Sequence, residues 1–144
     1  MKAPIVLAVD TPDIEIAKQW VAATQESVSV YKLGLEFFLS FGQEGIRAIQ
    51  SETDADIFLD LKLHDIPNTV AGACSSVAEL KPRFLTVHAS GGAEMVSAAV
   101  AASPGTSITA VTVLTSLNTD ELNKLGLPHQ TQTLALAMAK RAVE

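Results

Sequence analysis

The sequence predicts an α/β fold, a (β/α)8 TIM barrel of which residues 1–144 cover roughly the first five βα units as a single domain. Short apolar runs alternate with segments of helical periodicity, about 25 residues apart, as in consecutive βα units. These runs are apolar on both faces, which is typical of parallel strands covered by helices. An open doubly wound sheet would show the same alternation and stays the alternative.

The first unit begins with the β-branched run 4–10, which predicts a strand. Thr11 and Pro12 predict the start of a helix, because threonine is a common N-cap and proline suits the first turn. Apolar residues then recur at helical spacing: Ile14, Ala17, Trp20 and Val21.

The second and third units repeat this order. Residues 28–33 predict a strand, and a helix from residue 35 or 36 to 50 follows, although Gly42 and Gly45 weaken its first half. Residues 57–62 predict the third strand. The next helix, 67–80, ends before Pro82, because the residue before a proline avoids helical geometry.

The fourth and fifth units follow in the same way. Residues 84–88 predict a strand, and residues 90–92 open a helix that continues to about residue 102. Residues 107–114 predict the fifth strand. A helix start follows at Asn118 or Thr119.

A last helix is predicted to begin near Pro128 or His129 and to be still running at Glu144. A closed (β/α)8 barrel needs about 250 residues. We therefore expect the chain to be the front part of a longer one, whereas an open sheet would be complete here.

The composition is that of a globular protein with a substantial core, with 48% hydrophobic and 18% charged residues among 144. The net charge of −6 argues against nucleic acid as a partner. The apolar runs are too short to span a membrane, and the run after Met1 is too short for a signal peptide. The one cysteine, Cys74, excludes an internal disulfide and suits a reducing compartment, so we expect a cytoplasmic protein.

Polar residues gather at the carboxyl ends of the predicted strands, where parallel α/β folds bind ligands. Asp60 and Lys62 are two residues apart on one strand, so their side chains share a face. Charges on a buried strand need partners, which favours a catalytic site at this end of the sheet. The residues at the strand ends are Asp10, Lys32, Asp60, Lys62, His88, Thr115 and Ser116.

Several of these residues have a structural alternative. Asp10 would also suit the first position of a turn, and Lys32 would suit an edge strand with its ammonium in water. Asp60 and Lys62 would also form a purely structural ion pair. Asp65 is placed to cap the following helix.

The histidines and the remaining small polar residues have alternatives too. Thr69 would suit the first helical turn without a further task, and His88 would suit a core position. His64 is expected to pack or hydrogen-bond locally, and His129 to lie at the surface or a helix start. The histidines lack metal-ligand spacing and Cys74 lacks a CxxC partner, so no metal site is expected.

Residues 60–69 form the most specific motif of the chain: Asp60, Leu61, Lys62, Leu63, His64, Asp65, Ile66, Pro67, Asn68 and Thr69. This motif resembles the signature of the orotidine 5′-phosphate decarboxylase family. Residues 4–10, 31–34, 87–92 and 110–116 resemble that family's first, second, fourth and fifth strands. Related sugar-phosphate decarboxylases and lyases share only the shorter and less specific DxKxxD pattern.

The resemblance implies decarboxylation of orotidine 5′-phosphate to UMP, in de novo pyrimidine biosynthesis, without metal or cofactor. It implies that Lys62 donates the proton, that Asp60 lies against the substrate carboxylate, and that Lys32 bridges Asp60 and the ribose. It further implies a homodimer in which Asp65 and Thr69 reach the neighbouring site. Asp10 would bind the ribose, Thr115 or Ser116 would meet the pyrimidine, and the whole motif 60–69 would contact substrate.

Two competing interpretations stay open. Members of this family continue to eight strands and place a phosphate-binding arginine and a glutamine beyond the segments matched here. A partial barrel that folds or associates without catalysis is therefore one alternative. A related metal-dependent sugar-phosphate decarboxylase or lyase is the other.

Overall fold

Five parallel strands form one sheet in which the strand order follows the sequence, β1-β2-β3-β4-β5. The computed structural model describes residues 2–127 and 130–143. An unreversed order excludes the doubly wound alternative, in which the order reverses at a switch point. The strands are β1 (Ala3–Ala8), β2 (Val28–Gly34), β3 (Asp56–Leu63), β4 (Phe84–His88) and β5 (Ser107–Val111).

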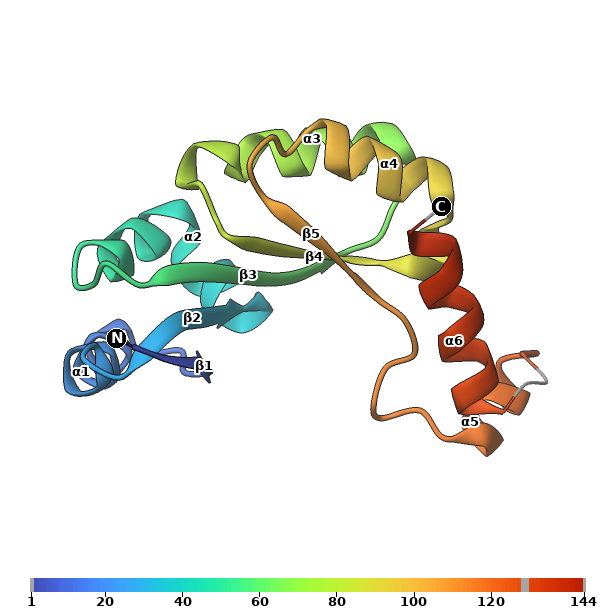
Figure 1. The fold of residues 1–144 in the computed structure, drawn as a ribbon, viewed down its shortest axis with the longest axis horizontal. Coiled ribbons are helices and arrows are strands. Elements are labelled where there is room, and N and C mark those ends of the chain that lie inside the picture. The colour runs from blue at the N-terminus through green and yellow to red at the C-terminus, as the bar shows by residue number, and fades with distance from the viewer. Residues whose placement is uncertain (1, 128–129, 144) are drawn as a thin grey trace.

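Helices connect the strands, as βα units require. Right-handed crossovers that all advance in one direction place their helices on the same side of the sheet and curl it. Figure 1 shows α3 and α4 arching over the curved sheet, and α6 standing beyond the end of β4. The α-helices are α1 (Ile14–Thr24), α2 (Leu35–Gln50), α3 (Pro67–Val77), α4 (Ala93–Ala101), α5 (Thr119–Lys124) and α6 (Thr131–Ala142), and the 3-10 turns are η1 (Ala78–Leu80) and η2 (Ala89–Gly91).

The core lies between the sheet and the helices. Tyr31 and Leu33 on β2, Leu59 on β3 and Leu85 on β4 are fully or almost fully buried there, together with Phe37 of α2. Because side chains alternate along a strand, the residues between them face the opposite side of the sheet. The apolar face therefore fixes which residues are presented on the other side.

The outer strands are more exposed than the sequence predicts. Ile5 and Val6 of β1 are each 50% exposed and no residue of β1 or β5 is buried, whereas each of the central strands β2 to β4 has at least three buried residues. β1 and β5 each pair with a neighbour on one side only. Burial on both faces thus holds for the central strands alone.

The start of the first helix differs from the prediction. Asp13, not Thr11, is the N-cap of α1, and its Oδ1 accepts hydrogen bonds from the backbone N–H groups of Glu15 and Ile16 at 2.9 and 3.1 Å. The Thr11 hydroxyl instead accepts from the Asp13 N–H, and Pro12 lies before the helix. Aspartate and threonine are both common caps, so the sequence alone did not separate them.

The middle of the chain follows the prediction closely. α2 runs through Gly45 but is kinked at Gly42, where φ is +58°. The predicted helix 67–80 is α3 followed by η1, and Lys81 ends it with a left-handed φ of +49°. The predicted fourth strand is confirmed residue for residue as β4.

The last third of the chain differs more from the prediction. β5 ends at Val111 instead of residue 114, because Val111 pairs with His88, where β4 itself ends. Asn118 is confirmed as the cap of α5, and its Oδ1 accepts from the Glu121 N–H at 3.0 Å. Pro128, His129 and Glu144 lie outside the described residues. α6 ends at Ala142, before the predicted end of the last helix.

Candidate active site

Four charged residues lie side by side at the carboxyl ends of β1, β2 and β3. We call Asp10, Lys32, Asp60 and Lys62 the charged row. Lys32 Nζ is 2.9 Å from Asp10 Oδ1 and 3.7 Å from Asp60 Oδ2. Lys62 Nζ is 2.8 and 2.9 Å from the two Asp60 oxygens. The predicted pairing of Asp60 with Lys62 is present, and the signs of charge alternate along the row.

Strand register explains why these side chains meet. β1 and β2 pair Ala8 with Lys32, and β2 and β3 pair Gly34 with Asp60. Gly34 also leaves room for the row, because a Cβ at this position would lie 3.2 Å from Asp10 Oδ1. The sequential strand order therefore brings residues far apart in the chain onto one stretch of the sheet.

Asp60 is the most buried member of the charged row, with 14% of its side chain exposed, against 21% for Lys32 and 39% for Lys62. Burial by itself raises the pKa of Asp60. Hydrogen bonds from Lys62 and Thr86, together with the positive charges of Lys62 and Lys32, outweigh burial and hold this pKa below its usual value. Asp60 is thus an ionised carboxylate between two ammonium groups at neutral pH.

Lys62 has an unusual backbone. Its φ is +49°, a left-handed conformation that non-glycine residues adopt rarely. The ladder between β3 and β4 is interrupted between Leu59 and Leu63. The Lys62 N–H donates to Thr86 Oγ1 at 2.8 Å, and Thr86 Oγ1 donates to Asp60 Oδ1 at 3.0 Å. Strained backbone of this kind is common at functional sites.

Thr86 is the residue that sequence reasoning missed. It is uncharged and lies in the middle of β4, so it carries no signal of its own. The alternation along β4 does place it on the same face as His88, two residues on. That shared face is the one sequence signal from which its place could be inferred.

The rest of the motif 60–69 is divided between core and surface. Leu61 is buried in the core, so its side chain faces away from the charged row, and Leu63 packs partly against the same core. Pro67 occupies the first turn of α3. The remaining residues are exposed on the segment that leads into α3 and on its first turn: His64, Asp65, Ile66, Asn68 and Thr69.

Asp65 does not cap α3, which corrects the structural alternative. Ile66 is the N-cap residue and provides no side-chain cap. The Asp65 carboxylate accepts a hydrogen bond from the adjacent Ile66 N–H at 2.7 Å. In the part of the chain that the structure describes, Asp65 joins none of the salt bridges of the charged row.

Thr115 and Ser116 lie in an exposed turn between β5 and α5, not at the end of the strand. The hydrogen bonds that hold the charged row come from Lys32, Lys62 and Thr86, and neither residue takes part in them. In the described part of the chain, these two residues are therefore not among the groups that hold the row together.

His64 and His88 stack beside the charged row, with ring centroids 5.1 Å apart. Ser90 Oγ lies 3.5 Å from His64 Nε2. Burial lowers the pKa of His88 below its usual value, and the neighbouring His64 and the positive charge of Lys62 lower it further. His88 is therefore neutral at neutral pH, in keeping with a packed histidine.

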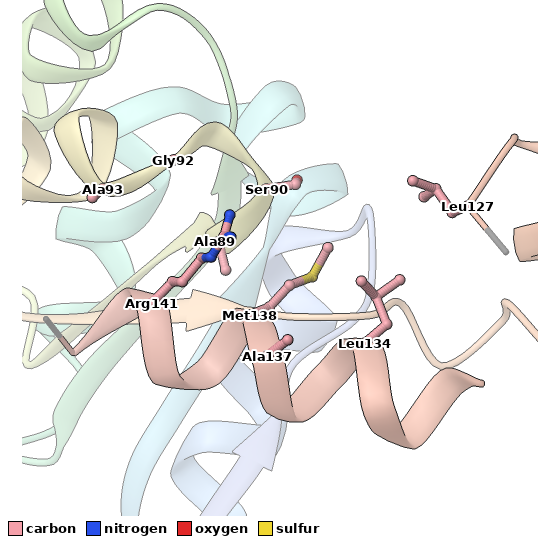
Figure 2. Close-up of a pocket in the computed structure, with 9 residues that line it drawn as sticks. All are labelled: Ala89, Ser90, Gly92, Ala93, Leu127, Leu134, Ala137, Met138 and Arg141. Carbon is pink, nitrogen blue, oxygen red and sulfur yellow. The ribbon is translucent and has the colours of Figure 1, made fainter. Parts of the chain in front are cut away.

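Two cavities lie next to this site. The larger, about 580 Å³, separates η2 and the start of α4 from α6, and Figure 2 shows Arg141 reaching from α6 toward Ala89. The smaller, about 190 Å³, has His64, His88 and Ser90 in its wall, with apolar residues of α5 and α6 opposite. The four residues of the charged row line neither cavity.

Residues 2–127 and 130–143 contain no cluster of three or more His, Cys, Asp or Glu side chains suited to a metal ion. None of their helices combines the length and apolarity that crossing a membrane would need.

Known proteins resemble this chain over its whole length. Residues 3–144 match the model of the orotidine 5′-phosphate decarboxylase / HUMPS family. An orotidine 5′-phosphate decarboxylase of Thermobifida fusca is 51% identical over 144 residues, which are all of this chain and 62% of that protein. One of Sphingopyxis alaskensis is 44% identical, over 99% of this chain and 65% of that protein. The chain thus spans less than two thirds of the length of these relatives.

Solved structures agree with this assignment. The crystal structure of orotidine 5′-phosphate decarboxylase from Lactobacillus acidophilus matches with a TM-score of 0.85 and 32% identity, over 96% of this chain and 66% of that one. The enzyme from Pyrococcus horikoshii matches with a TM-score of 0.78 and 25% identity, over 94% and 60%. The predicted fold class, a (β/α) barrel represented by its first five units, is confirmed. This chain belongs to the orotidine 5′-phosphate decarboxylase / HUMPS family.

Proposed function

We propose that the protein containing this chain decarboxylates orotidine 5′-phosphate to UMP, as a step of de novo pyrimidine biosynthesis. The observation that carries this proposal is the charged row, in which Asp60 bonds Lys62 at 2.8 Å and lies within 3.7 Å of Lys32. The names of the relatives in Thermobifida fusca and Sphingopyxis alaskensis support it.

The chemistry needs a fixed positive charge at the reacting carbon. Breaking the bond from C6 of the pyrimidine to the carboxylate releases CO₂ and leaves the electron pair on C6. An ammonium held there stabilises the developing negative charge and then donates its proton to C6. We assign this role to Lys62, whose side chain is 39% exposed and therefore open to a ligand. Solvent returns the proton to Lys62.

Asp60 holds the two lysines in place. Its carboxylate is ionised, accepts a hydrogen bond from Lys62 and lies within 3.7 Å of Lys32. In the proposed complex Asp60 lies against the substrate carboxylate. As neutral CO₂ forms, the negative charge next to Asp60 disappears and its electron pair moves to C6, beside the Lys62 ammonium. Repulsion from Asp60 is thereby relieved, which favours the product side.

The other members of the site bind the substrate. Lys32, which contacts both Asp10 and Asp60, would bridge the row to the ribose, and Asp10 would bind a ribose hydroxyl. Thr115 or Ser116, in the turn after β5, would meet the pyrimidine. No metal or organic cofactor takes part in the proposed reaction.

We assign the exposed residues of the motif 60–69 to contacts with a second subunit. Asp65 and Thr69 lie at the start of α3 and are exposed, as is Ile66 at 66%. We propose that the protein is a homodimer in which Asp65 and Thr69 reach the neighbouring subunit's site. We further propose one barrel domain and a cytoplasmic location.

The test is the reaction of the full-length protein with orotidine 5′-phosphate, followed by the appearance of UMP. We expect Lys62→Ala to lower kcat by at least about a thousandfold, because it removes both the charge and the proton. EDTA should leave the wild-type rate unchanged, which separates this reaction from that of a metal-dependent sugar-phosphate lyase.

Lys81→Ala is the matched control. Lys81 has the same φ of +49° as Lys62 but ends η1, ahead of β4 at the opposite end of the sheet. It should retain wild-type turnover. A Lys62→Ala protein that still works within tenfold of wild type would remove Lys62 from its role.

A further inference from the structure

Thr86 lies where the charged row meets the fourth strand. Its side chain is 3% exposed, although it is on the face of β4 that does not carry the apolar core. Its neighbours Leu85 and Val87 point into that core and are 1% and 0% exposed. A buried hydroxyl must find hydrogen-bond partners, and both partners of Thr86 belong to β3.

The directions of these two hydrogen bonds are fixed by chemistry. The backbone N–H of Lys62 only donates, so the Thr86 hydroxyl accepts this bond at 2.8 Å. The hydroxyl has one hydrogen, and this hydrogen is directed to Asp60 Oδ1 at 3.0 Å. One hydroxyl thus holds the backbone of the lysine and the carboxylate that this lysine contacts.

The hydroxyl also replaces a missing ladder bond. Leu59 pairs with Leu85 and Leu63 pairs with Val87, so β3 uses four steps where β4 uses two. Within this bulge Lys62 adopts its left-handed φ of +49°. Bulges redirect side chains, and both Asp60 and Lys62 lie within this one, with Lys62 Nζ 2.8 Å from Asp60 Oδ1.

We propose that Thr86 is a positioning residue: its hydroxyl holds the Lys62 backbone and the Asp60 carboxylate in the relative geometry that the reaction requires. This proposal rests on the proposed function. Thr86 itself touches neither the substrate nor the reacting atoms. It acts through the two residues that it joins.

The test compares three variants of the full-length protein. Thr86→Val removes the hydroxyl and keeps the shape, and Thr86→Ser keeps the hydroxyl. Thr24→Val is the control, because its hydroxyl bonds Trp20 O and Tyr31 Oη near the end of α1, at the other end of the sheet. This control also loses side-chain hydrogen bonds, one of them partly buried, but not at the site.

We expect Thr86→Val to lower kcat by roughly 10- to 100-fold with KM changed less than about threefold, the size of one lost hydrogen bond to a charged group. Thr86→Ser and Thr24→Val should keep kcat within about threefold of wild type. Carbon-13 NMR titration of the Asp60 carboxyl should show a higher pKa in Thr86→Val than in wild type and Thr86→Ser. A merely structural role would not move this titration.

Three results would overturn the proposal: wild-type kcat in Thr86→Val, an equal loss in Thr86→Ser, or an Asp60 titration that is the same in all variants. If Thr86→Val does not fold, kcat and the Asp60 titration are compared between Thr86→Ala and Thr86→Ser, since these two variants differ only by the hydroxyl. A wild type that forms no UMP is a separate failure, that of the proposed function, and the Asp60 titration then decides alone whether Thr86 holds the pair.

Discussion

Replacing Asp60 with alanine tests whether the charged row is one coupled unit. Asp60 is 14% exposed and accepts hydrogen bonds from Lys62 and Thr86 at 2.8 and 3.0 Å. Losing one partner of a fully buried pair costs about 3–5 kcal/mol, whereas an exposed pair contributes about 0–1 kcal/mol. Because Lys62 is 39% exposed and water reaches its ammonium, we expect Asp60→Ala to lower the free energy of unfolding by about 2 kcal/mol.

Two other variants make the experiment selective. Asp60→Asn keeps the size of the side chain and an acceptor for the Thr86 hydroxyl, so its loss should be smaller, about 1 kcal/mol. Asp10→Ala removes a carboxylate that is 60% exposed and bonded to Lys32, so its loss should not exceed about 1 kcal/mol.

Urea unfolding of the full-length protein, followed by circular dichroism, measures these differences. A loss below about 0.5 kcal/mol for Asp60→Ala is the range of ordinary surface substitutions and would refute the reasoning. Equal losses for Asp60→Ala and Asp10→Ala would refute it too, because burial would then not decide the strength of the pair.

Two further predictions concern pH and assembly. Since burial, His64 and Lys62 lower the pKa of His88 from 6.5, the unfolded chain binds this proton first as pH falls, and stability is lost below about pH 6.5. His88→Gln should therefore flatten the fall in Tm between about pH 7 and pH 5, and an equally steep fall in both proteins would contradict this. The Asp65→Ala and Lys62→Ala proteins, each inactive alone, should regain activity when they are mixed. A mixed dimer contains one site in which both residues are wild type. Mixtures that stay inactive at every ratio would exclude the shared site.

The sequence predicted those parts of the fold that depend on local pattern. The apolar runs gave β2, β3 and β4 to within one or two residues, and the alternation of Asp60 and Lys62 predicted their pairing. The predicted N-cap of α1 was wrong. Thr11 and Asp13 are both suited to the N-cap position, and which of them occupies it depends on where the chain leaves β1. The predicted end of β5 was wrong, because the length of β4, its pairing partner, sets where β5 ends.

The site was predictable in its charges but not in its geometry. The left-handed backbone of Lys62 arises from the mismatch between β3 and β4, and no pattern within β3 records it. The role of Thr86 follows from the same mismatch. The placement of Thr115 and Ser116 in a turn likewise depends on the early end of β5.

The sequential strand order has a consequence for how the protein acquires its chemistry. Every group that holds the charged row lies on β2, β3 or β4 or, for Asp10, just after β1, and each strand pairs with its immediate neighbours in the chain. Each of these pairings closes a loop of one βα unit, which costs less conformational entropy than pairing strands far apart in the chain. The lysines and aspartates of the charged row are therefore set against one another by pairings among β1 to β4, and within the described residues β5 and the helices after it contribute none of the hydrogen bonds between them.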